Sequence, residues 1–336
     1  MVEAAKWGVI GNATIARKCV IPAIRKSSNG NIVALATRHP AQAEQIAADN
    51  HIGQVYDSYE ALLVDPQVDL VYIPLPNHLH HPWTIKALKA GKHVLCEKPL
   101  ACNAEEAREM AAAAKDAGRL LMEAFMYRFH PRSLRIKQLI AEGAIGTPRL
   151  VRSAFCFRMA DSEWHDPPNL RLIPEMGGGA LLDVGSYSVS VARWFLGAEP
   201  SRAQAQALYD PGGVDVHTVG SLGFGGNGLA CFEVSFITAL QQTFSIAGSE
   251  GVIELPHDAF VPWENEAIFY VRGRDQETGQ KHRVPGADEY RLMVEHFADA
   301  ALGRAELRFA ISDSIENMRV LDALAQAARM GQTIKL

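Results

Sequence analysis

Short apolar runs alternate with helix-forming stretches through the first 125 residues of the chain, and this rhythm constrains the fold more than any other feature. Runs rich in Val, Ile and Leu, each followed by a helical pattern, are typical of a parallel sheet covered by helices on both faces. We therefore predict an α/β doubly wound domain over residues 1–125. Its predicted strands are residues 6–10, 31–36, 54–56, 69–74, 93–97 and 120–124, and its predicted helices are residues 15–26, 40–50, 58–64, 82–90 and 104–117.

The pattern changes after residue 125, where longer β-forming stretches follow one another without a helix between each pair. This arrangement favours an antiparallel sheet, so we predict an α+β second domain over residues 126–336 with a large, open, mainly antiparallel sheet. No linker-like segment separates the two domains, and a cleft between them is the expected ligand site. The predicted strands are residues 149–158, 202–209, 216–224, 229–238, 242–255 and 266–272, and the predicted helices are residues 179–196, 288–302 and 313–330.

The composition excludes several classes of protein. The 336-residue chain carries 33 basic and 38 acidic side chains, so it lacks the basic surface that binds nucleic acid or an anionic membrane. No apolar run approaches the roughly 18 residues that cross a bilayer, and the N-terminus does not resemble a secretory signal. Five scattered cysteines favour reduced thiols over a disulfide framework or a zinc site. We expect a cytoplasmic protein that binds a small molecule.

A dinucleotide-binding loop is predicted directly after the first strand. Gly11-x-Ala13-x-x-Ala16 is a variant of the glycine fingerprint, with alanine at its second and third positions. The loop joins a strand to a helix, so free N–H groups at the helix start can bind a pyrophosphate. A tight turn that needs small residues only for packing is the alternative. The cofactor-binding residues predicted in this loop are Gly11, Asn12, Ala13, Thr14 and Ile15.

The end of the second strand indicates which dinucleotide binds. Thr37 and Arg38 stand where a carboxylate would hold the adenosine ribose of NAD, and the sequence has no acid there. The planar guanidinium of Arg38 can pair with a 2′-phosphate, and the Thr37 hydroxyl can add a hydrogen bond. We predict NADP(H) as the cofactor, with NAD(H) as the weaker alternative. A solvated arginine at a strand end is the interpretation without a ligand.

Residues 74–81 follow the fourth strand at the same sheet edge. We predict that Leu75, Pro76, Asn77 and His80 line the cofactor, with Asn77 and His80 making polar contacts to its nicotinamide half. Three histidines in this loop suggest a metal, but no Cys, Asp or Glu lies in the loop to complete a site. We therefore predict no metal.

The fifth strand ends in Glu97-Lys98-Pro99, which brings a lysine to this sheet edge. Pro99 restricts Lys98 to an extended conformation, so the ammonium has a defined direction. An ammonium beside a substrate oxygen stabilises developing negative charge or lowers the pKa of a neighbour. We predict that Lys98 is catalytic and that Glu97 and Lys98 contact the cofactor. A strand-end turn with a solvated lysine is the alternative.

Gly177-Gly178-Gly179 opens a predicted helix that carries Asp183 and Tyr187, and their four-residue spacing puts both on one face. A carboxylate on this partly apolar face needs a cation or donors, and Lys98 is the obvious cation. A phenol with an ordinary pKa of about 10 becomes a usable acid or base when an ammonium is close. We predict that Asp183 and Tyr187 are catalytic. A core tyrosine with a satisfied hydroxyl is the alternative for Tyr187.

Taken together, these elements resemble the glucose-fructose oxidoreductase, inositol dehydrogenase and MocA superfamily over nearly the whole chain. The segments that carry the resemblance are the Gly11 loop and residues 76–80, 90–99, 122–131 and 177–187. Met-Tyr-Arg-Phe-His-Pro at residues 126–131 and Tyr187 are similar to the branch of dimeric dihydrodiol dehydrogenases, aldose (xylose) dehydrogenases and glucose-fructose oxidoreductase. Members like inositol dehydrogenase usually have histidine where this chain has Tyr187.

The resemblance implies a Rossmann domain for residues 1–125 and assigns roles to further residues. Lys98, Asp183 and Tyr187 match the catalytic positions of the superfamily. Arg128 and Arg171 fall near positions that approach the cofactor or the substrate, and we add both to the cofactor-binding set. The open sheet of the second domain commonly forms the oligomer interface, so we expect a homodimer or homotetramer.

These observations predict an NADP-dependent oxidoreductase. It would transfer a hydride between nicotinamide and a secondary alcohol or hemiacetal carbon of a sugar or cyclic diol, as aldose (xylose) 1-dehydrogenases and dihydrodiol dehydrogenases do. Tyr187 would exchange the hydroxyl proton, while Lys98 and Asp183 fix the substrate. A ketoreductase acting on a nucleotide-linked deoxysugar or an anhydro-sugar is the alternative within enzymes. A non-catalytic NADP-binding regulator is the alternative from another class, and it need not keep these three residues together.

Overall fold

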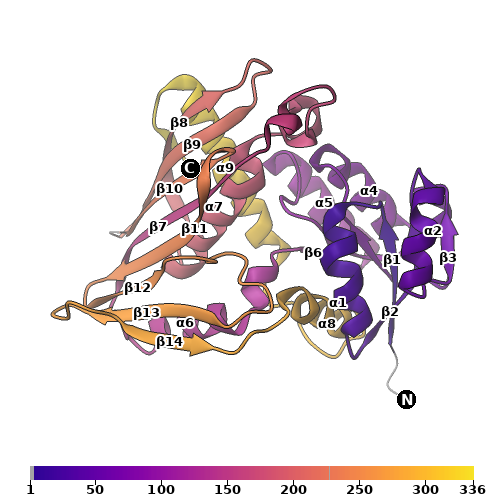
Figure 1. The fold of residues 1–336 in the computed structure, drawn as a ribbon, viewed down its shortest axis with the longest axis horizontal. Coiled ribbons are helices and arrows are strands. Elements are labelled where there is room, and N and C mark those ends of the chain that lie inside the picture. Colours follow the sequence, from indigo (N-terminus) through magenta and orange to yellow (C-terminus); the bar gives the residue numbers. More distant parts are fainter. Residues whose placement is uncertain (1–3, 227) are drawn as a thin grey trace. The chain divides into compact units, whose positions relative to one another are not determined.

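A computed structural model describes residues 4–226 and 228–336, and the chain divides into two compact units (Figure 1). Unit 1 consists of Met1–Phe129 and Asp288–Ile315, and unit 2 consists of His130–Ala287 and Glu316–Leu336. The break after Phe129 lies four residues beyond the boundary that we predicted after residue 125. The segment Asp288–Ile315, which we assigned to the second domain, groups with unit 1 instead.

Across the described residues of unit 1, six parallel strands form a sheet in the order β3-β2-β1-β4-β5-β6. The strand order reverses between β1 and β4, which is the switch point where open α/β sheets bind dinucleotides. This topology confirms the predicted doubly wound domain. The strands are β1 (Ala5–Ile10), β2 (Gly30–Ala36), β3 (Gln54–Tyr56), β4 (Leu70–Ile73), β5 (His93–Cys96) and β6 (Leu121–Glu123).

Helix α5 of unit 1 begins and ends at residues that local chemistry favours. Asn103 caps α5 by accepting the Glu106 N–H, and Gly118 ends it with a φ of 60°. Helix α4 begins five residues before the predicted start at Pro82. The helices are η1 (Ala16–Val20), α1 (Ile21–Lys26), α2 (Pro40–Asp49), α3 (Tyr59–Val64), α4 (Asn77–Lys89), α5 (Ala104–Ala117), η2 (Met126–Phe129) and α8 (Glu289–Ala301).

The described part of unit 2 contains a nine-stranded sheet in the order β14-β13-β12-β11-β7-β10-β9-β8-β15. Strands β7 and β10 are parallel and the other neighbours are antiparallel, which confirms the large, mainly antiparallel sheet. The predicted strand 242–255 is two strands, because Ser249 and Glu250 form a turn. The strands are β7 (Pro148–Arg158), β8 (Pro200–Tyr209), β9 (Asp215–Phe224), β10 (Gly228–Ser235), β11 (Ile237–Gly248), β12 (Gly251–Leu255), β13 (Ala267–Gly273), β14 (Gln280–Val284) and β15 (Ile334–Lys335).

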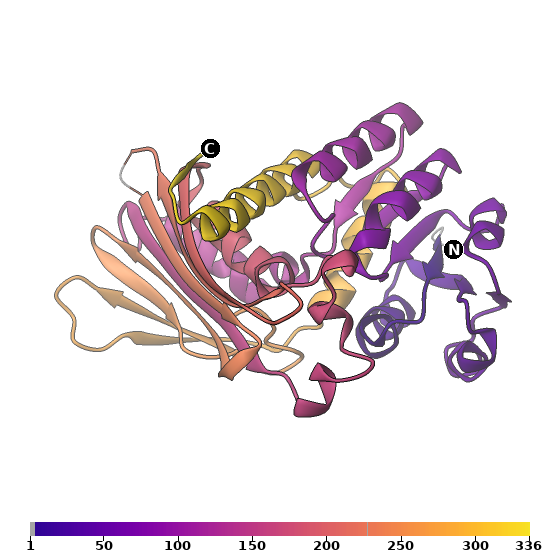
Figure 2. The same ribbon diagram turned by 90° about the horizontal axis from the view of Figure 1, so that it is seen from above.

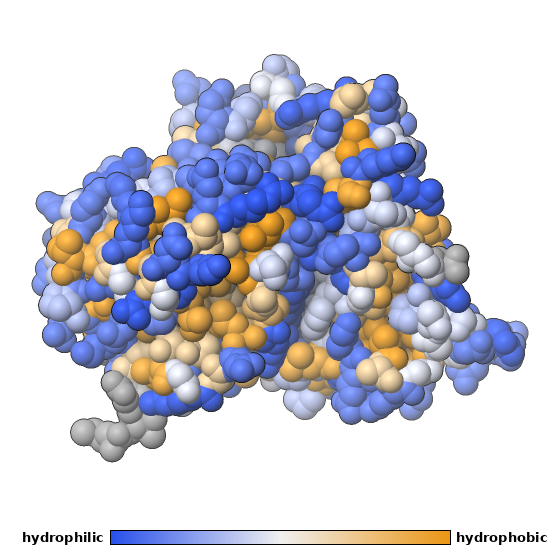
Figure 3. Space-filling view, turned by 180° about the vertical axis from the view of Figure 1, so that it is seen from behind, coloured by the Kyte–Doolittle hydropathy of each residue, from blue (hydrophilic) through white to orange (hydrophobic). Residues whose placement is uncertain are grey.

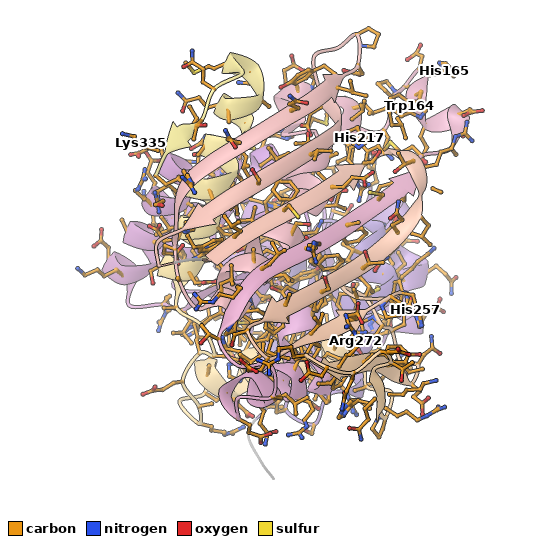
Figure 4. All side chains as sticks on the ribbon, turned by 90° about the vertical axis from the view of Figure 1, so that its left-hand side faces the viewer. Trp164, His165, His217, His257, Arg272 and Lys335 are labelled. Carbon is orange, nitrogen blue, oxygen red and sulfur yellow. The ribbon has the colours of Figure 1, made fainter. Side chains whose placement is uncertain are left out.

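Helices gather on one face of the unit 2 sheet (Figure 2). Helix α7 packs on β7, and the long helix α9, which begins in the segment of unit 1, continues along unit 2. The opposite face carries no helix from the described ranges, and His217 and Arg272 project from it in Figure 4. The helices are α6 (Pro131–Ala141), η3 (Asp161–Trp164), η4 (Leu170–Leu172), η5 (Pro174–Met176), η6 (Leu181–Gly185), α7 (Ser186–Leu196) and α9 (Ile311–Met330).

Each unit has its own apolar core. Trp7 packs on Phe297 in unit 1, with ring centroids 5.8 Å apart, and Phe155 stacks on Phe260 in unit 2 at 5.0 Å. Fully burying a side chain of this kind is worth about 1.5–3 kcal/mol, so the first pair holds β1 to α8 and the second holds β7 to the loop after β12. Hydrophilic residues cover much of the face seen in Figure 3, with hydrophobic residues between them. None of the helices described here is both long and apolar enough to cross a membrane.

Candidate active site

The loop after β1, predicted to bind a dinucleotide, has a backbone conformation that depends on Gly11. Gly11 has a φ of +104°, and a Cβ there would lie 2.8 Å from Cδ2 of Leu75, so only glycine fits. The helical backbone begins at Thr14, and the buried Oδ1 of Asn12 has no hydrogen-bond partner among the described residues. A glycine turn followed directly by a helix start has the form that the sequence predicts for dinucleotide binding, and the binding itself remains a prediction.

The end of β2 brings Thr37 and Arg38 to the same edge of the sheet. Thr37 is buried, and its Oγ1 accepts the backbone N–H of His39 at 3.2 Å. The side chain of Arg38 is exposed and makes no ion pair within the part of the chain that the structure describes. This arrangement leaves the guanidinium available for a ligand phosphate, which is the role that the sequence predicts.

Of the four residues predicted to contact the cofactor from the loop after β4, only two are partly exposed. Leu75 packs where a Cβ of Gly11 would be, and Pro76 and Asn77 are half-buried at the start of α4. His80 differs from the prediction, because it is fully buried and offers no surface to a cofactor. These positions leave Asn77 as the polar cofactor contact predicted from this loop.

His80 instead ties two loops of unit 1 together. Its Nε2 lies 2.7 Å from the Leu75 carbonyl oxygen and its Nδ1 lies 2.8 Å from the Pro99 carbonyl oxygen. Burial lowers the pKa of His80 to about 4, while the two carbonyl contacts act in the opposite direction, because only the charged ring can donate to both oxygens. His80 therefore positions the ends of β4 and β5, which carry other candidate residues.

Glu97 and Lys98 follow β5 at this edge. Glu97 is 9% exposed, and its Oε1 accepts the Tyr72 hydroxyl at 2.6 Å, so most of this carboxylate faces the protein. Lys98 is half-buried, and its backbone N–H donates to Oε2 of Glu97 at 3.3 Å. Glu97 thus fixes the backbone that presents Lys98, while Lys98 keeps surface for a ligand.

Arg128 is placed differently from the prediction. Its side chain is 3% exposed, donates to Asp313 at 2.6 Å and lies over the rings of Phe125 and Phe309. A guanidinium buried in this way is paired within unit 1, and it has almost no surface for a cofactor. We therefore correct its assignment from a cofactor contact to an internal ion pair that holds η2 to the start of α9.

In unit 2 the glycine-led helix carries Asp183 and Tyr187 as predicted. Residues Leu181–Gly185 form a π-helical turn and Ser186–Leu196 continue as α7, so Asp183 lies inside the irregular turn. Single π-turns inside helices are frequent at functional sites. The Tyr187 ring is nearly buried and contacts Phe155 and Phe260, with centroids 5.4 and 5.7 Å away. The helix therefore holds both side chains in defined positions.

Within unit 2, Arg171 forms an ion pair with Asp183. Its Nε donates to Oδ2 of Asp183 at 2.6 Å, and the proximity of this carboxylate raises the pKa of the guanidinium. The negative charge of a Tyr187 phenolate also favours charged Arg171, so the three groups form one cluster. We predicted Arg171 as a cofactor contact and Lys98 as the partner of Asp183, and the ion pair within unit 2 was not foreseen.

Sequence reasoning also missed the residues that support Tyr187. Arg132, in the first turn of α6, is almost fully buried and donates to the backbone carbonyls of Asp258 and Ala259 at 2.8 and 2.5 Å. These bonds fix the loop that places Phe260 against Tyr187. Among the described residues no group of three or more His, Cys, Asp or Glu side chains could hold a metal ion.

Comparisons with known proteins agree with this architecture. The model of the oxidoreductase family with an NAD-binding Rossmann fold matches residues 5–125, and the model of the GFO/IDH/MocA C-terminal domain matches residues 133–254. The chain is 38% identical to D-xylose 1-dehydrogenase (NADP(+)) 2 of Haloferax volcanii over 331 residues, which cover 98% of this chain and 99% of that protein.

Two further relatives extend the comparison. Trans-1,2-dihydrobenzene-1,2-diol dehydrogenase of Xenopus tropicalis is 33% identical over 285 residues, which cover 83% of this chain and 82% of the relative. A crystal structure of a 3-ketoreductase from Actinomadura kijaniata in complex with NADP and TDP-benzene superimposes with a TM-score of 0.89 at 29% identity, covering 97% and 98% of the two chains. The resemblance seen in the sequence is thereby confirmed, and the chain belongs to the GFO/IDH/MocA family of oxidoreductases.

Proposed function

We propose that this protein is an NADP(H)-dependent dehydrogenase that oxidises a secondary alcohol or hemiacetal carbon of a sugar or cyclic diol. The observation that carries the proposal is the Arg171–Asp183 ion pair at the helical turn that leads into Tyr187. A paired carboxylate beside a phenol can orient a substrate hydroxyl and leave the phenol to exchange its proton. The relatives named above, a xylose dehydrogenase and a dihydrodiol dehydrogenase, support the same chemistry.

The chain supplies orientation and proton transfer in this proposal. When bound, NADP supplies the nicotinamide that accepts or returns the hydride. Tyr187 takes the proton of the substrate hydroxyl during oxidation and gives it back during reduction. A general acid or base of this kind is worth about 10² to 10⁴ in rate. Asp183, held by Arg171, accepts a hydrogen bond from a neighbouring hydroxyl and fixes the sugar.

Lys98 is proposed as the ammonium that favours the phenolate of Tyr187. It follows β5 at the carboxyl edge of the sheet, where ligands of doubly wound domains bind. A positive charge close to a phenol lowers the pKa of that phenol, because it favours the anion. The cofactor-binding set proposed around it is Gly11, Asn12, Ala13, Thr14, Ile15, Thr37, Arg38, Leu75, Pro76 and Asn77.

NADP is favoured over NAD by the exposed guanidinium of Arg38. Arginine binds phosphate oxygens through two parallel N–H donors, and such charge-assisted bonds are about twice as strong as neutral ones. The structurally similar 3-ketoreductase was crystallised with NADP, and the similar xylose dehydrogenase is named for NADP(+). A carboxylate that would favour the NAD ribose is absent from residues 36–39.

A ketoreductase acting on a nucleotide-linked deoxysugar is the second candidate. The TM-score of 0.89 to a 3-ketoreductase crystallised with a TDP compound favours it. The two candidates use the same hydride and proton chemistry and differ in whether the substrate carries a nucleotide. Only the identity of the substrate that is turned over therefore distinguishes the two candidates.

A substrate panel tests the proposal. Nicotinamide absorbance is followed with NADP(+) and NAD(+) in parallel against D-xylose, other aldoses and a trans-dihydrodiol, and with NADPH against anhydro-sugar ketones and TDP-linked ketosugars. We expect NADP(+) reduction with a free sugar or diol. Turnover of TDP-ketosugars alone would select the second candidate, and no turnover despite NADP binding would favour the non-catalytic regulator.

We also propose that two copies of the chain associate through the open face of the unit 2 sheet. This face contains a groove of about 790 Å³, lined by side chains of β7, β9, β10, β11, β12 and β13. Val219 and Leu229 on this face are each 51% exposed, and association with a second copy would remove these apolar side chains from water. The five cysteines form no disulfides, and this supports a reducing, cytoplasmic location.

A further inference from the structure

The helix that carries Asp183 and Tyr187 is capped by a residue from another element. The residue at its N-cap position is Ala180, whose side chain cannot accept a hydrogen bond. The first residue of β9, Asp215, supplies the missing acceptor, because its Oδ2 accepts the Leu181 N–H at 2.7 Å. The Thr218 hydroxyl donates to the same oxygen at 2.9 Å and fixes the direction of the carboxylate.

The glycines at the start of this helix make room for the carboxylate. Gly179 has a φ of +123°, and a Cβ there would overlap Oδ1 of Asp215. On the other side, a Cβ at Gly178 would lie 2.6 Å from the Arg171 carbonyl oxygen, and the Gly179 N–H donates to that oxygen at 2.9 Å. The helix start is therefore clamped between Asp215 and the backbone of Arg171.

The charge of Asp215 is costly at this place. Burial raises its pKa to about 6, while the Leu181 N–H, the Thr218 hydroxyl and the positive charge of Arg329 on α9 act in the opposite direction. Packing alone would be served by a neutral side chain, whereas a carboxylate at a helix start both accepts a backbone N–H and interacts with the helix dipole. The hydrogen bond to the Leu181 N–H and the interaction with the helix dipole therefore offset the free-energy cost of burying the Asp215 carboxylate.

We propose that Asp215 is a positioning residue that sets the place of Asp183 and Tyr187 by holding the amide of Leu181. The π-turn Leu181–Gly185 lies between the held amide and Tyr187, so a shift at the helix start moves both side chains. Arg171 is fixed to the same start through its backbone and to Asp183 through its side chain. This inference rests on the proposed function for its effect on turnover, and on the hydrogen bonds of unit 2 for its effect on structure.

Hydrogen exchange of the helix, combined with steady-state kinetics, tests the proposal. In Asp215→Ala, we expect the amides of residues 180–187 to exchange about fivefold faster or more, because the cap is lost. We expect kcat to fall about tenfold to a hundredfold with the KM for NADP unchanged within about twofold. Asp215→Asn keeps an oxygen acceptor and should recover most of both properties.

Asp210→Ala is the matched control, because Asp210 accepts the Val214 N–H in the turn between β8 and β9 without contacting the helix. It should leave exchange of residues 180–187 and kcat unchanged. If Asp215→Ala does not fold, Thr218→Val carries the test, because it removes the hydrogen bond that directs the Asp215 carboxylate and should give a smaller increase in exchange of the same amides. Wild-type exchange in all Asp215 and Thr218 variants, or an equal effect of Asp210→Ala, would overturn the proposal. A wild type that turns over no sugar would overturn the proposed function only, because the exchange data still decide the role of Asp215.

Discussion

At the scale of single residues, the candidate site depends on a carboxylate and a guanidinium that already form an ion pair without a ligand. Asp183 has a side chain only 12% exposed, and a lone carboxylate at such a place would be expensive. The sequence predicts that Asp183 needs a cation nearby, but it does not identify Arg171 as that cation. Arg171 lies on a short 3-10 segment without helical or strand periodicity, so only the fold brings it to Asp183. The sequence does not identify Asp215 as part of the site either, because it is 32 positions from Asp183 and only the fold brings it to the start of the helix.

The choice of cofactor is a property of one side chain, Arg38. We predict that Arg38→Ala raises the KM for NADP(+) about tenfold to a hundredfold, because hydrogen bonds to a charged group contribute about 1.5–3 kcal/mol. The KM for NAD(+) should change little. Lys18→Ala, which removes an exposed cation from η1, is the control and should leave both constants unchanged. Steady-state kinetics with both cofactors measures these values, and equal losses for NADP(+) and NAD(+) would contradict the assignment.

The buried side chain of Glu123 should make the free energy of unfolding depend on pH. It is fully buried, and its Oε1 accepts the Leu100 N–H at 2.9 Å. Burial raises its pKa from 4.5 to about 7, so the folded protein binds this proton more tightly than the unfolded chain does. The resulting stability is present below about pH 4.5 and is lost as the pH rises through about 7.

Glu123→Gln keeps an acceptor for Leu100 and removes the proton equilibrium. Relative to this variant, the free energy of unfolding of the wild type should fall by roughly 3 kcal/mol between acidic and mildly alkaline pH. Urea unfolding across this range measures the difference. Glu105→Gln, at an exposed position of α5, is the control and should follow the wild type. A Glu123→Gln profile parallel to that of the wild type would refute a proton held on Glu123.

At the scale of elements, apolar runs and the glycine, proline and capping residues at their ends predict most of unit 1. Strand β3 and helix α5 have the predicted bounds, and α5 carries strong local signals in its capping residue Asn103 and its terminal Gly118. Helix α6 was not predicted, since Arg132 and Ser133 are buried among its core-facing residues and interrupt the apolar pattern. Strand β15 was also missed, because two residues carry too little pattern to be recognised.

The start of the helix with Asp183 and Tyr187 gives a test at this scale. Gly179→Ala places a side chain at a φ of +123° and against Asp215, so we expect a loss of at least about 2 kcal/mol of stability and a large fall in kcat. Gly197→Ala is matched at the other end of α7, with a φ of +66° and open space around it. It should cost about 1 kcal/mol and leave kcat unchanged. Denaturation and kinetics of both variants check this, and full activity in Gly179→Ala would contradict it.

At the scale of the whole molecule, the order of domains along the chain is predictable and the membership of each segment is not. Residues 288–315 follow the second domain in sequence but pack with the first. Trp7 contacts Phe297, and the Asn29 side chain donates to Asp299 at 2.8 Å, so α8 belongs to unit 1 through partners about 270 residues away. No local pattern records such contacts, which is why the helix was assigned to its neighbours in sequence.

The proposed association through the unit 2 sheet is tested by a charge on its open face. Val219→Glu places a carboxylate at an exposed position of β9, and its desolvation in an interface would be costly. We expect the mass measured by light scattering to fall from that of an oligomer to that of the monomer. Val64→Glu, at a 77% exposed position of α3 in unit 1, is the control and should leave the oligomer intact. A monomeric wild type, or an unchanged mass in Val219→Glu, would contradict the assignment.

The central claim is that Tyr187 exchanges the substrate proton in an NADP-dependent oxidation, and one comparison tests it most directly. Initial rates of NADP(+) reduction by the wild type and by Tyr187→Phe are measured with the best substrate of the panel, together with NADP affinity by fluorescence. The account predicts that kcat falls by about 10² to 10⁴ while NADP affinity stays within about twofold. Equal kcat values in the two proteins would remove Tyr187 from the chemistry and contradict the account.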